Sequence, residues 1–528
     1  MKKTVALVLT SAMVMGLIAG CQSSENNESQ GAKDNGTSSS PAASEADSSG
    51  TDEASNEDMA EIILSMFAMG EIPKDVQLVE DGINKITEPE INVHVTLDVL
   101  ESGNYAQQVS LRMSGQEKMD IMLTNPSGAV SFANMFAANQ LTPLGDLMEE
   151  YGQDILATLG ELANSMKVGG DIYGLPRNAS MVSSDYICMR TDILEELGLL
   201  EKAQNMTSFT EFEEILAAVK ENYDLAPIVA SSGGTVLSVA GVAMKDKFED
   251  CTSVDVLNDT MKILSVEPGT TTVKNFFATD DYAEMAERVR GWYEKGYVYK
   301  DSTTTTDNAE SIVKQNGAFS WISTSEIGVE AAKRDATGYD ITCVKIDTHI
   351  IGTSNCTKFA WVVPITSDEP EAAMKVLNLM YKDGRISTLL AWGVEGTHYV
   401  LDDEGVAHYP EGVTAENCGY HTVDFLVPNQ LEVPVWEGAE PDLREQAKAE
   451  METAPISQFL GFTMDSTQVS NEVSALLNCL DEYMPMIESG VGSEADLAQF
   501  LEKLNSSGVD KYVSEAQKQL DEWLQQQK

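Results

Sequence analysis

The chain has 528 residues, of which 42% are hydrophobic, so it is long enough to bury the cores of two or three domains. Its formal net charge is −51, from 85 acidic and 34 basic residues. A surface this negative excludes nucleic acid as a partner and excludes attachment to anionic lipid by charge, because both would repel it. The charge suits an exported protein that stays soluble, but it identifies no ligand.

The chain begins with a secretory signal. A basic start precedes an apolar run over residues 5–18, which is too short for a permanent membrane span. Residues 1–20 are therefore predicted to be a signal peptide. Its last residues and Cys21, Leu-Ile-Ala-Gly-Cys, resemble a bacterial lipobox, which implies cleavage before Cys21 and lipid attachment to its sulfur. Several acyl chains would hold the protein at the extracellular face of the cell membrane. An ordinary secretory peptide is the alternative.

Residues 21–58 are predicted to be a disordered tether. They are rich in Ser, Asn, Gly, Ala and acidic residues and contain almost no large apolar side chain. Such a segment cannot bury enough surface to offset the loss of chain entropy on folding. Its expected use is to lift the folded part off the membrane.

The cysteines and histidines form no recognisable metal or redox motif. There is no CxxC pair and no HExxH spacing, so no metal and no cofactor are expected. Outside the cell the cysteines beyond Cys21 could form disulfides, but spacing does not say which, and buried free thiols are the alternative. These cysteines are Cys188, Cys251, Cys343, Cys356, Cys418 and Cys479.

From residue 59 onward, strand and helix patterns alternate. Strand, helix, strand, helix, strand is the order of a parallel α/β sheet. The expected elements are a strand over residues 61–69, a helix ending near Ile86, an alternating strand over 91–99, a helix over 105–113 and a strand over 120–124.

The same alternation continues to the end of the chain. Tyr282, Met285, Val289, Trp292 and Tyr293 are predicted to form one buried helical stripe, which is usually core. Further elements are strands over residues 172–176, 184–189, 317–321 and 359–363; helices over 192–197 and 371–381; a helix to Lys220 behind a Ser208–Glu211 capping box; and an amphipathic terminal helix over 509–523.

Five local motifs occur in a fixed order. They are YAQQVSLRMSGQEKMDIM at 105–122, IYGLPRNASMVSSDYICMRTDILEELG at 172–198, GAFSW at 317–321, PEAAMKVLNLMYKDGRISTLLAWGVEGTHY at 370–399 and GFTMD at 461–465. In this order they resemble the extracellular substrate-binding lipoproteins of ABC importers, with maltose-binding-type topology. The last two are similar to the aldouronate- or oligosaccharide-binding branch and its C-terminal module. Met189-Arg190 departs from that family's usual Asn-Lys.

The resemblance implies an α/β, two-lobe periplasmic-binding-protein-like fold of type II topology, with a hinge, an interlobe cleft and a helical C-terminal region. Lobe 1 would comprise residues 59–180 plus 362–430, and lobe 2 residues 185–355 plus 455–528. The ligand would lie at the carboxyl ends of the strands and be enclosed by hinge closure. The implied partners are a small-molecule ligand, expected to be an oligosaccharide, and ABC permease subunits. The protein is expected to be a monomer.

Sugars need flat aromatic faces for stacking and planar polar groups for their hydroxyls. Trp321 is a candidate for stacking, with core packing as the alternative. Asn125 is a candidate at a strand end, or else a turn residue. Asp98 lies on the polar face of its strand and could instead be a solvated edge.

Four further candidates are less sharply placed. Arg177 could bind a hydroxyl or carboxylate or form an interlobe salt bridge; for a uronate ligand, Arg190 is the second choice of cation. Tyr186 is either core or cleft. Trp392 is expected on a glycine-rich turn that either lines the cleft or supports the hinge. Phe67 ends the first strand.

The chain lacks G-x-S-x-G, P-loop, G-x-G-x-x-G and metal-spacing motifs, so it is not expected to be an enzyme. A surface glycoside-active enzyme, an adhesive lipoprotein, and a binder of peptide or polyamine remain as alternatives.

Overall fold

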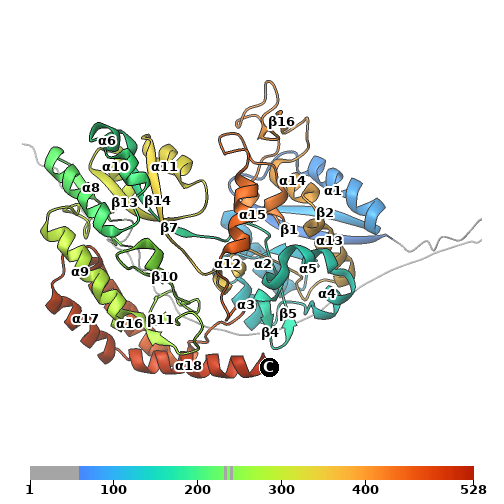
Figure 1. Ribbon diagram of the computed structural model, residues 1–528. Helices are drawn as coiled ribbons and strands as arrows, with labels where there is room; N and C mark the ends of the chain where they lie inside the picture. The colour runs from blue at the N-terminus through green and yellow to red at the C-terminus, as the bar shows by residue number, and fades with distance from the viewer. Residues whose placement is uncertain (1–58, 231–234, 238–241, 528) are drawn as a thin grey trace, which may run out of the picture. The chain divides into compact units, whose positions relative to one another are not determined.

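The computed structural model describes residues 59–230, 235–237 and 242–527. The predicted signal peptide, the lipid-attachment residue Cys21 and the predicted tether lie outside these residues. The described chain builds two mixed sheets with helices packed around each (Figure 1). The α/β two-lobe fold that the sequence predicted is confirmed.

The first sheet has five strands in the order β2-β1-β3-β15-β6. β1 pairs in parallel with both β2 and β3, so the predicted parallel β-α-β-α-β unit is confirmed. β15 comes from much later in the chain and lies antiparallel to both β3 and β6. The elements are β1 (Ala60–Ala68), α1 (Val76–Ile91), β2 (Val93–Glu101), α2 (Ser102–Gly115), β3 (Ile121–Leu123), β6 (Leu175–Pro176) and β15 (Ala360–Val362).

Local sequence explains these elements well. Val93, Val95 and Leu97 of β2 are buried while Thr96 is exposed, as the alternation predicted. The predicted end of α1 near Ile86 was wrong. The helix continues through Pro89 and ends where Asn92 takes a left-handed conformation and donates its N–H to the carbonyl of Glu88.

The second sheet has the order β14-β7-β13-β8, with helices on both faces. β7 pairs antiparallel with β13 and β14, and β13 is parallel to β8. Ile187 and Met189 face the large core with α8 and α9, whereas Tyr186 and Cys188 face a smaller core with α10 and α11. The elements are β7 (Ser184–Arg190), α8 (Phe209–Asn222), β8 (Ala226–Ile228), α9 (Asp280–Glu294), α10 (Ala309–Lys314), β13 (Ala318–Ser325), α11 (Val329–Thr337) and β14 (Ile341–Thr348).

Two helices test the sequence patterns directly. The Ser208 hydroxyl accepts the Glu211 N–H at 3.2 Å, so the predicted cap of α8 is confirmed, although the Glu211 carboxylate reaches back to the N–H of Thr207. Tyr282, Met285, Val289 and Trp292 of α9 are buried. Tyr293 is 38% exposed, so its place in the stripe was wrong, because one residue turns the helix by about 100°.

Shorter elements complete the described chain. The strand predicted over residues 172–176 is split into β5 and β6, with Gly174 packed tightly between them. The remaining helices and strands are α3 (Phe132–Ala137), α4 (Gly145–Tyr151), α5 (Gln153–Leu159), β4 (Lys167–Val168), β5 (Asp171–Ile172), α6 (Thr191–Glu196), α7 (Leu200–Gln204), β9 (Val242–Ala243), β10 (Thr252–Ser253), β11 (Leu264–Ser265), β12 (Lys274–Asn275), α12 (Thr353–Thr357), α13 (Pro370–Lys382), α14 (Arg385–Trp392), β16 (Val400–Leu401), β17 (Ala407–His408) and α15 (Leu443–Thr453).

Three connecting segments, residues 177–183, 349–359 and 454–458, join the two sheets and their cores. They are hydrogen-bonded to one another. Ile351 donates its N–H to the carbonyl of Pro455 at 2.8 Å, and Ser457 donates to the carbonyl of Ile351 at 2.9 Å. The Asn355 amide donates to the carbonyl of Met181 at 3.4 Å.

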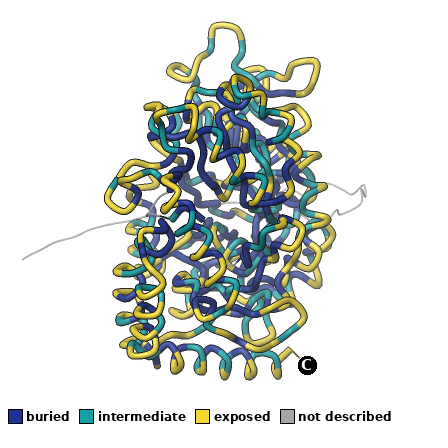
Figure 2. The backbone as a smooth tube through the Cα atoms, turned by 60° about the vertical axis from the view of Figure 1, so that its left-hand side comes forward, coloured by how far each residue is buried: buried dark blue, intermediate teal, exposed yellow. Residues whose placement is uncertain are grey.

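The C-terminal helices pack on the core of the second sheet. They are α16 (Ser470–Glu488), α17 (Glu494–Ser506) and α18 (Val509–Gln526). Tyr512, Ala516 and Leu520 of α18 are buried, which confirms the predicted amphipathic helix, and its turns alternate between buried and exposed in Figure 2. Over the described ranges, no helix combines the length and apolar character needed to cross a membrane.

Glu488, at the end of α16, is a carboxyl group inside this packed region. It is 1% exposed, and the Tyr282 hydroxyl lies 3.5 Å from its Oε1. Burial raises the pKa of Glu488 to about 7, although a hydrogen bond from Thr235, the charge of Lys262 and the Tyr282 hydroxyl act in the opposite direction. Folding therefore favours the protonated acid.

We expect Glu488→Gln to stabilise the protein at pH 8 by about 3 kcal/mol and to have little effect near pH 4.5. The folded-state pKa lies above the usual 4.5. The stability that the wild-type protein gains from this group is therefore present below pH 4.5 and is lost as pH rises through about 7. The measurement is denaturant unfolding at both pH values. Glu522→Gln, on an exposed turn of α18, is the matched control. Equal effects of the two variants at pH 8 would contradict the assignment.

Candidate ligand-binding site

Strand directions bring several chain segments to one edge of the first sheet. The carboxyl ends of β1, β3 and β6 and the amino end of β15 meet there, because β15 is antiparallel to its neighbours. Phe67 lies at the end of β1, Asn125 follows β3, Arg177 follows β6 and Phe359 precedes β15. We call this the first edge. It is the place where open α/β sheets bind ligands.

A row of aromatic rings follows the first edge. The ring centroids are 5.0 Å apart for Tyr105 and Phe67, 6.3 Å for Phe67 and Phe359, and 5.9 Å for Phe359 and Phe425. Exposure increases along the row: Tyr105 is fully buried and Phe67 is 4% exposed, whereas Phe359 is half-buried and Phe425 is 36% exposed. The row therefore ends in a hydrophobic face that is open to solvent.

Arg177 supports the exposed end of this aromatic row. Its guanidinium carbon lies 5.4 Å from the centre of the Phe359 ring, and its Nη1 donates to the carbonyl of Phe425. The residue is only 8% exposed. Burial lowers the pKa of Arg177, while the charges of Glu326, Tyr381, Asp424 and Cys356 oppose that change. A nearly buried guanidinium beside two phenyl rings provides N–H donors next to a stacking surface.

The corresponding edge of the second sheet is polar. Here the carboxyl ends of β13 and β14 meet the amino end of β7. Asp185, fully buried, accepts hydrogen bonds from the Thr324 hydroxyl at 2.5 Å and contacts His349 Nε2 at 3.1 Å. The hydroxyls of Ser184 and Thr348 lie 3.2 Å apart. We call this the second edge; its groups are suited to binding hydroxyls.

Two titratable groups of the second edge have shifted pKa values. Burial raises the pKa of Asp347 to about 6. Burial lowers the pKa of His349, but its hydrogen bond to Asp185 and the charges of Asp185 and Asp347 outweigh this effect, and the net shift is upward. The edge therefore changes its charge in the mildly acidic range.

Glu326 relates the two edges electrostatically. It directly follows β13 and its side chain is exposed, yet surrounding protein desolvates the carboxyl group and raises its pKa, while the charges of Arg177 and Lys358 lower it. Arg177 follows β6 on the first edge. A cation of one edge and an anion of the other are therefore close enough to interact electrostatically.

Trp321 and Tyr186 lie in the smaller core of the second sheet. Trp321 is 1% exposed and pairs in register with Cys188, and its indole N–H has no hydrogen-bond partner among the described residues. Tyr186 is 8% exposed. Arg190, the alternative cation for a uronate, lies at the opposite end of β7 from Asp185, where it contacts Asp192 and the ring of Tyr339.

The other predicted residues have partners within the fold. The backbone N–H of Asn125 donates to the carbonyl of Val130 at 3.0 Å, which closes a turn after β3. Trp392 is the last residue of α14, so its expected place on a turn was wrong. The helix ends only at Gly393, which follows Trp392 and has a φ of 83°. The Trp392 ring stacks on His421 at 4.9 Å, and its indole N–H donates to the carbonyl of Pro434 at 2.9 Å.

Asp98 is engaged by two side chains. It accepts a hydrogen bond from Ser65, its register partner on β1, at 2.9 Å, and it forms an ion pair with Arg112 of α2. Both interactions tie β2 to its neighbours.

Several site residues were not selected from the sequence. Phe359 lies in a predicted strand, but no residue pattern around it indicated that its ring would lie at the edge of the sheet. Phe425 lies in a short 3₁₀ helix, Asp424–Leu426, whose surrounding sequence has no hydrophobic periodicity. Asp185 and His349 are 164 residues apart, so only the pairing of β7 with β14 brings them together.

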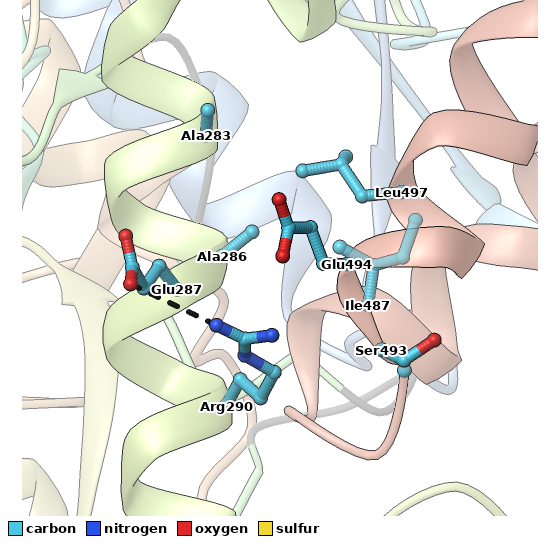
Figure 3. A pocket seen from close by; sticks show the side chains of 9 residues that line it. Ala283, Ala286, Glu287, Arg290, Ile487, Ser493, Glu494 and Leu497 are labelled. Atoms are coloured by element: carbon cyan, nitrogen blue, oxygen red, sulfur yellow. Dashed lines mark ion pairs between the residues drawn. The ribbon is translucent and has the colours of Figure 1, made fainter.

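Several pockets lie along the described part of the chain. One of about 350 Å³ adjoins the second edge and is lined by Asp347, Asp255 and the connecting residues Ile350 and Ser457. Another of about 210 Å³ lies between α9 and α17 (Figure 3), where Arg290 pairs with Glu287 at 3.7 Å. In the part of the chain that the structure describes, no group of three or more His, Cys, Asp or Glu residues could hold a metal ion.

Comparison with protein families gives two matches. The family described as "Bacterial extracellular solute-binding protein" matches residues 83–392, which is more than half of the chain. The family described as "Domain of unknown function (DUF3502)" matches residues 458–525, the segment that contains α16 to α18.

Individual relatives agree with the family match. A protein of Streptococcus pneumoniae named "Carbohydrate ABC transporter substrate-binding protein" is 26% identical over 478 residues, covering 88% of this chain and 92% of the relative. The N-glycan transport solute-binding protein NgtS of the same species has the same fold, with a TM-score of 0.69 and 21% identity over 89% of this chain and 100% of that one. NgtS in complex with Man1GlcNAc gives a TM-score of 0.58 and 22% identity, over 88% and 99%.

We expect Asp98→Ala to lower the free energy of unfolding by about 1–2 kcal/mol, because it removes the Ser65 hydrogen bond and the Arg112 ion pair. Asp98→Asn, which can keep the hydrogen bond, should lose less. Denaturant unfolding measures both. A tenfold loss of ligand affinity at unchanged stability would instead place Asp98 in the binding site.

Proposed function

The chain belongs to the bacterial extracellular solute-binding protein family, and from that membership we propose that it captures an oligosaccharide outside the cell and delivers it to an ABC permease. The observation that carries the proposal is the aromatic row at the first edge, which ends in the exposed ring of Phe425 with Arg177 beside it.

The two edges offer what a sugar needs. Phe359 and Phe425 present ring faces on which the C–H face of a pyranose stacks. Thr324 and His349 of the second edge, both bonded to the buried Asp185, offer acceptors and donors for hydroxyl groups. A ligand that has both apolar faces and many hydroxyls fits this combination better than a wholly charged or a wholly apolar one.

The relatives favour the same ligand class. The relative from Streptococcus pneumoniae is named for carbohydrate transport, and NgtS has been crystallised with Man1GlcNAc and with Man5GlcNAc. We therefore propose glycans of this type as the first ligands to test.

We further propose that capture occurs by hinge closure. The moving bodies are lobe 1, residues 59–180 plus 362–430, and lobe 2, residues 185–355 plus 455–528. Bending at the connecting segments would bring the second edge onto a ligand stacked on the first. Arg177 and Glu326 carry opposite charges on the two edges and would favour the closed state. Trp321 and Tyr186 support the second sheet from within its core.

A titration of the purified protein tests the proposal. We expect saturable binding of mannose–N-acetylglucosamine glycans. A glycan present at 100 times its dissociation constant should raise the free energy of unfolding by about 2.7 kcal/mol. Binding of peptides or polyamines alone would contradict the proposed carbohydrate ligand but would still agree with a role in an ABC importer. Turnover of a glycan that one Asp or Glu substitution abolishes would identify an enzyme. Absence of binding to every solute would favour an adhesive surface protein.

We expect Phe425→Ala to weaken glycan binding roughly tenfold, or about 1.4 kcal/mol, because it removes the exposed stacking face. Its effect on the free energy of unfolding should be about 1–2 kcal/mol, since the ring is partly exposed and only part of its area is lost. Tyr293→Ala is the matched control, because Tyr293 is an equally exposed aromatic on α9. Calorimetric titration of both variants decides; equal affinities would remove Phe425 from the site.

The membrane attachment is also part of the proposal. Lipidation of Cys21 would keep the protein at the extracellular face of the membrane, beside its permease, with residues 21–58 as a tether. We expect Cys21→Ser to release the protein from the membrane fraction of cells, whereas Cys418→Ser should stay in that fraction. Fractionation followed by immunoblotting measures both. A membrane-bound Cys21→Ser protein would show that another element anchors it.

A further inference from the structure

Two cysteines face each other across neighbouring strands of the second sheet. Cys188 of β7 and Cys343 of β14 are register partners in an antiparallel pair, and their Sγ atoms lie 3.4 Å apart. Cys188 is fully buried, whereas Cys343 is half-buried. We propose that these two thiols are a redox site, which an exported disulfide-bearing oxidant converts to a disulfide between β7 and β14.

The backbone geometry is already suitable for this bond. Directly opposed residues in an antiparallel pair have Cα atoms about 4.5–5.5 Å apart. Disulfides span Cα separations of about 4.4–6.8 Å. The sulfurs are in van der Waals contact, so rotation of the two side chains closes the remaining distance without a change in strand pairing.

The other described cysteines have different neighbours. The Cys251 thiol donates to the carbonyl of Lys245, Cys418 to the carbonyl of Tyr420, and Cys356 to the sulfur of Met181. No second pair of thiols in the described part of the chain lies in hydrogen-bonding contact. The juxtaposition of Cys188 with Cys343 is therefore specific to this pair of strands.

The reaction is an ordinary thiol–disulfide exchange. Cys343, the more accessible thiol, loses its proton to water and attacks one sulfur of the oxidant's disulfide. That bond breaks, and the second sulfur of the oxidant leaves as a thiol. Cys188 then loses its proton and attacks Cys343 Sγ, which releases the first sulfur of the oxidant. The two thiols lose two electrons, and the oxidant's disulfide is reduced to two thiols.

The order of attack follows from the surroundings of the two residues. Burial raises the pKa of the Cys188 thiol well above its ordinary value. A neutral, enclosed thiol is a poor nucleophile toward an external disulfide. Cys188 therefore acts second, on a sulfur that the strand pairing already holds against it.

The bond would fix β14 beside the second edge. Beyond Cys343 this strand has a register shift between Lys345 and Asp347 and then leads to His349 and the connecting segment. A disulfide would join residues 155 positions apart and prevent separation of β14 from β7. The redox state of the pair would thus set how firmly one side of the second edge is held. This inference needs the extracellular location that family membership implies, and it does not depend on the identity of the ligand.

The test compares the full-length protein after treatment with dithiothreitol and with oxidised glutathione. We expect oxidation to produce a peptide containing Cys188 linked to Cys343, found by mass spectrometry after alkylation of free thiols. The temperature of unfolding should rise by about 5 °C on oxidation and return on reduction. Cys343→Ser should abolish both changes, while Cys251→Ser should keep them.

Two results would overturn the proposal. One is alkylation of both Cys188 and Cys343 in the oxidised protein, which would show that the pair stays reduced. The other is a glutathione adduct on Cys343 that does not progress to the linked peptide, which would show that Cys188 cannot resolve it. Either result can be obtained without any glycan, so it leaves the proposed transport function untouched.

Discussion

The insertion of β15 between β3 and β6 is the constraint on which the arrangement depends. The strand begins at Ala360, so the first sheet is completed only after the chain has built the second sheet and returned. Two hydrogen bonds hold it there: the Thr124 N–H donates to the carbonyl of Ala360 at 2.8 Å, and the Ala360 N–H donates to the Thr124 hydroxyl at 2.9 Å. Because β15 is antiparallel to both neighbours, its first residues lie at their carboxyl ends. This direction places Phe359 beside Arg177 and completes the aromatic row.

The two edges have complementary chemistry because strand direction decides which residues meet at each of them. The first edge gathers residues that end or precede apolar strands, and it is aromatic with one buried cation. The second edge gathers Ser, Thr, Asp and His from the ends of β13, β7 and β14. Neither edge alone suits a sugar, since stacking leaves the hydroxyls unpaired and hydrogen bonding leaves the apolar face in water. In the proposed binding mode, a solute that satisfies both edges would lie between them, and its binding would depend on their approach.

Local sequence was sufficient for much of the fold. The alternation in β2, the cap at Ser208 and the amphipathic face of α18 depend on neighbours within a few residues, and all three were predicted correctly. The candidate site was harder, because its contacts join distant parts of the chain. Arg177 and Phe67 could be selected from their positions at strand ends. Phe425 carries no periodic signal, and the contact between Asp185 and His349 depends on a register across 164 residues, which no local pattern specifies.

The hydrogen bonds among the connecting segments restrict how the two sheets can move. A single flexible linker would allow rotation about any axis. Here Ile351 is paired with Pro455 and Ser457, and Asn355 is bonded to Met181, so the three segments would bend together in the proposed closure. The segment at 454–458 also leads into the C-terminal helices, which pack on the core of the second sheet. The C-terminal module therefore belongs to the same packed body as the second sheet, and in the proposed hinge closure it would move with that sheet.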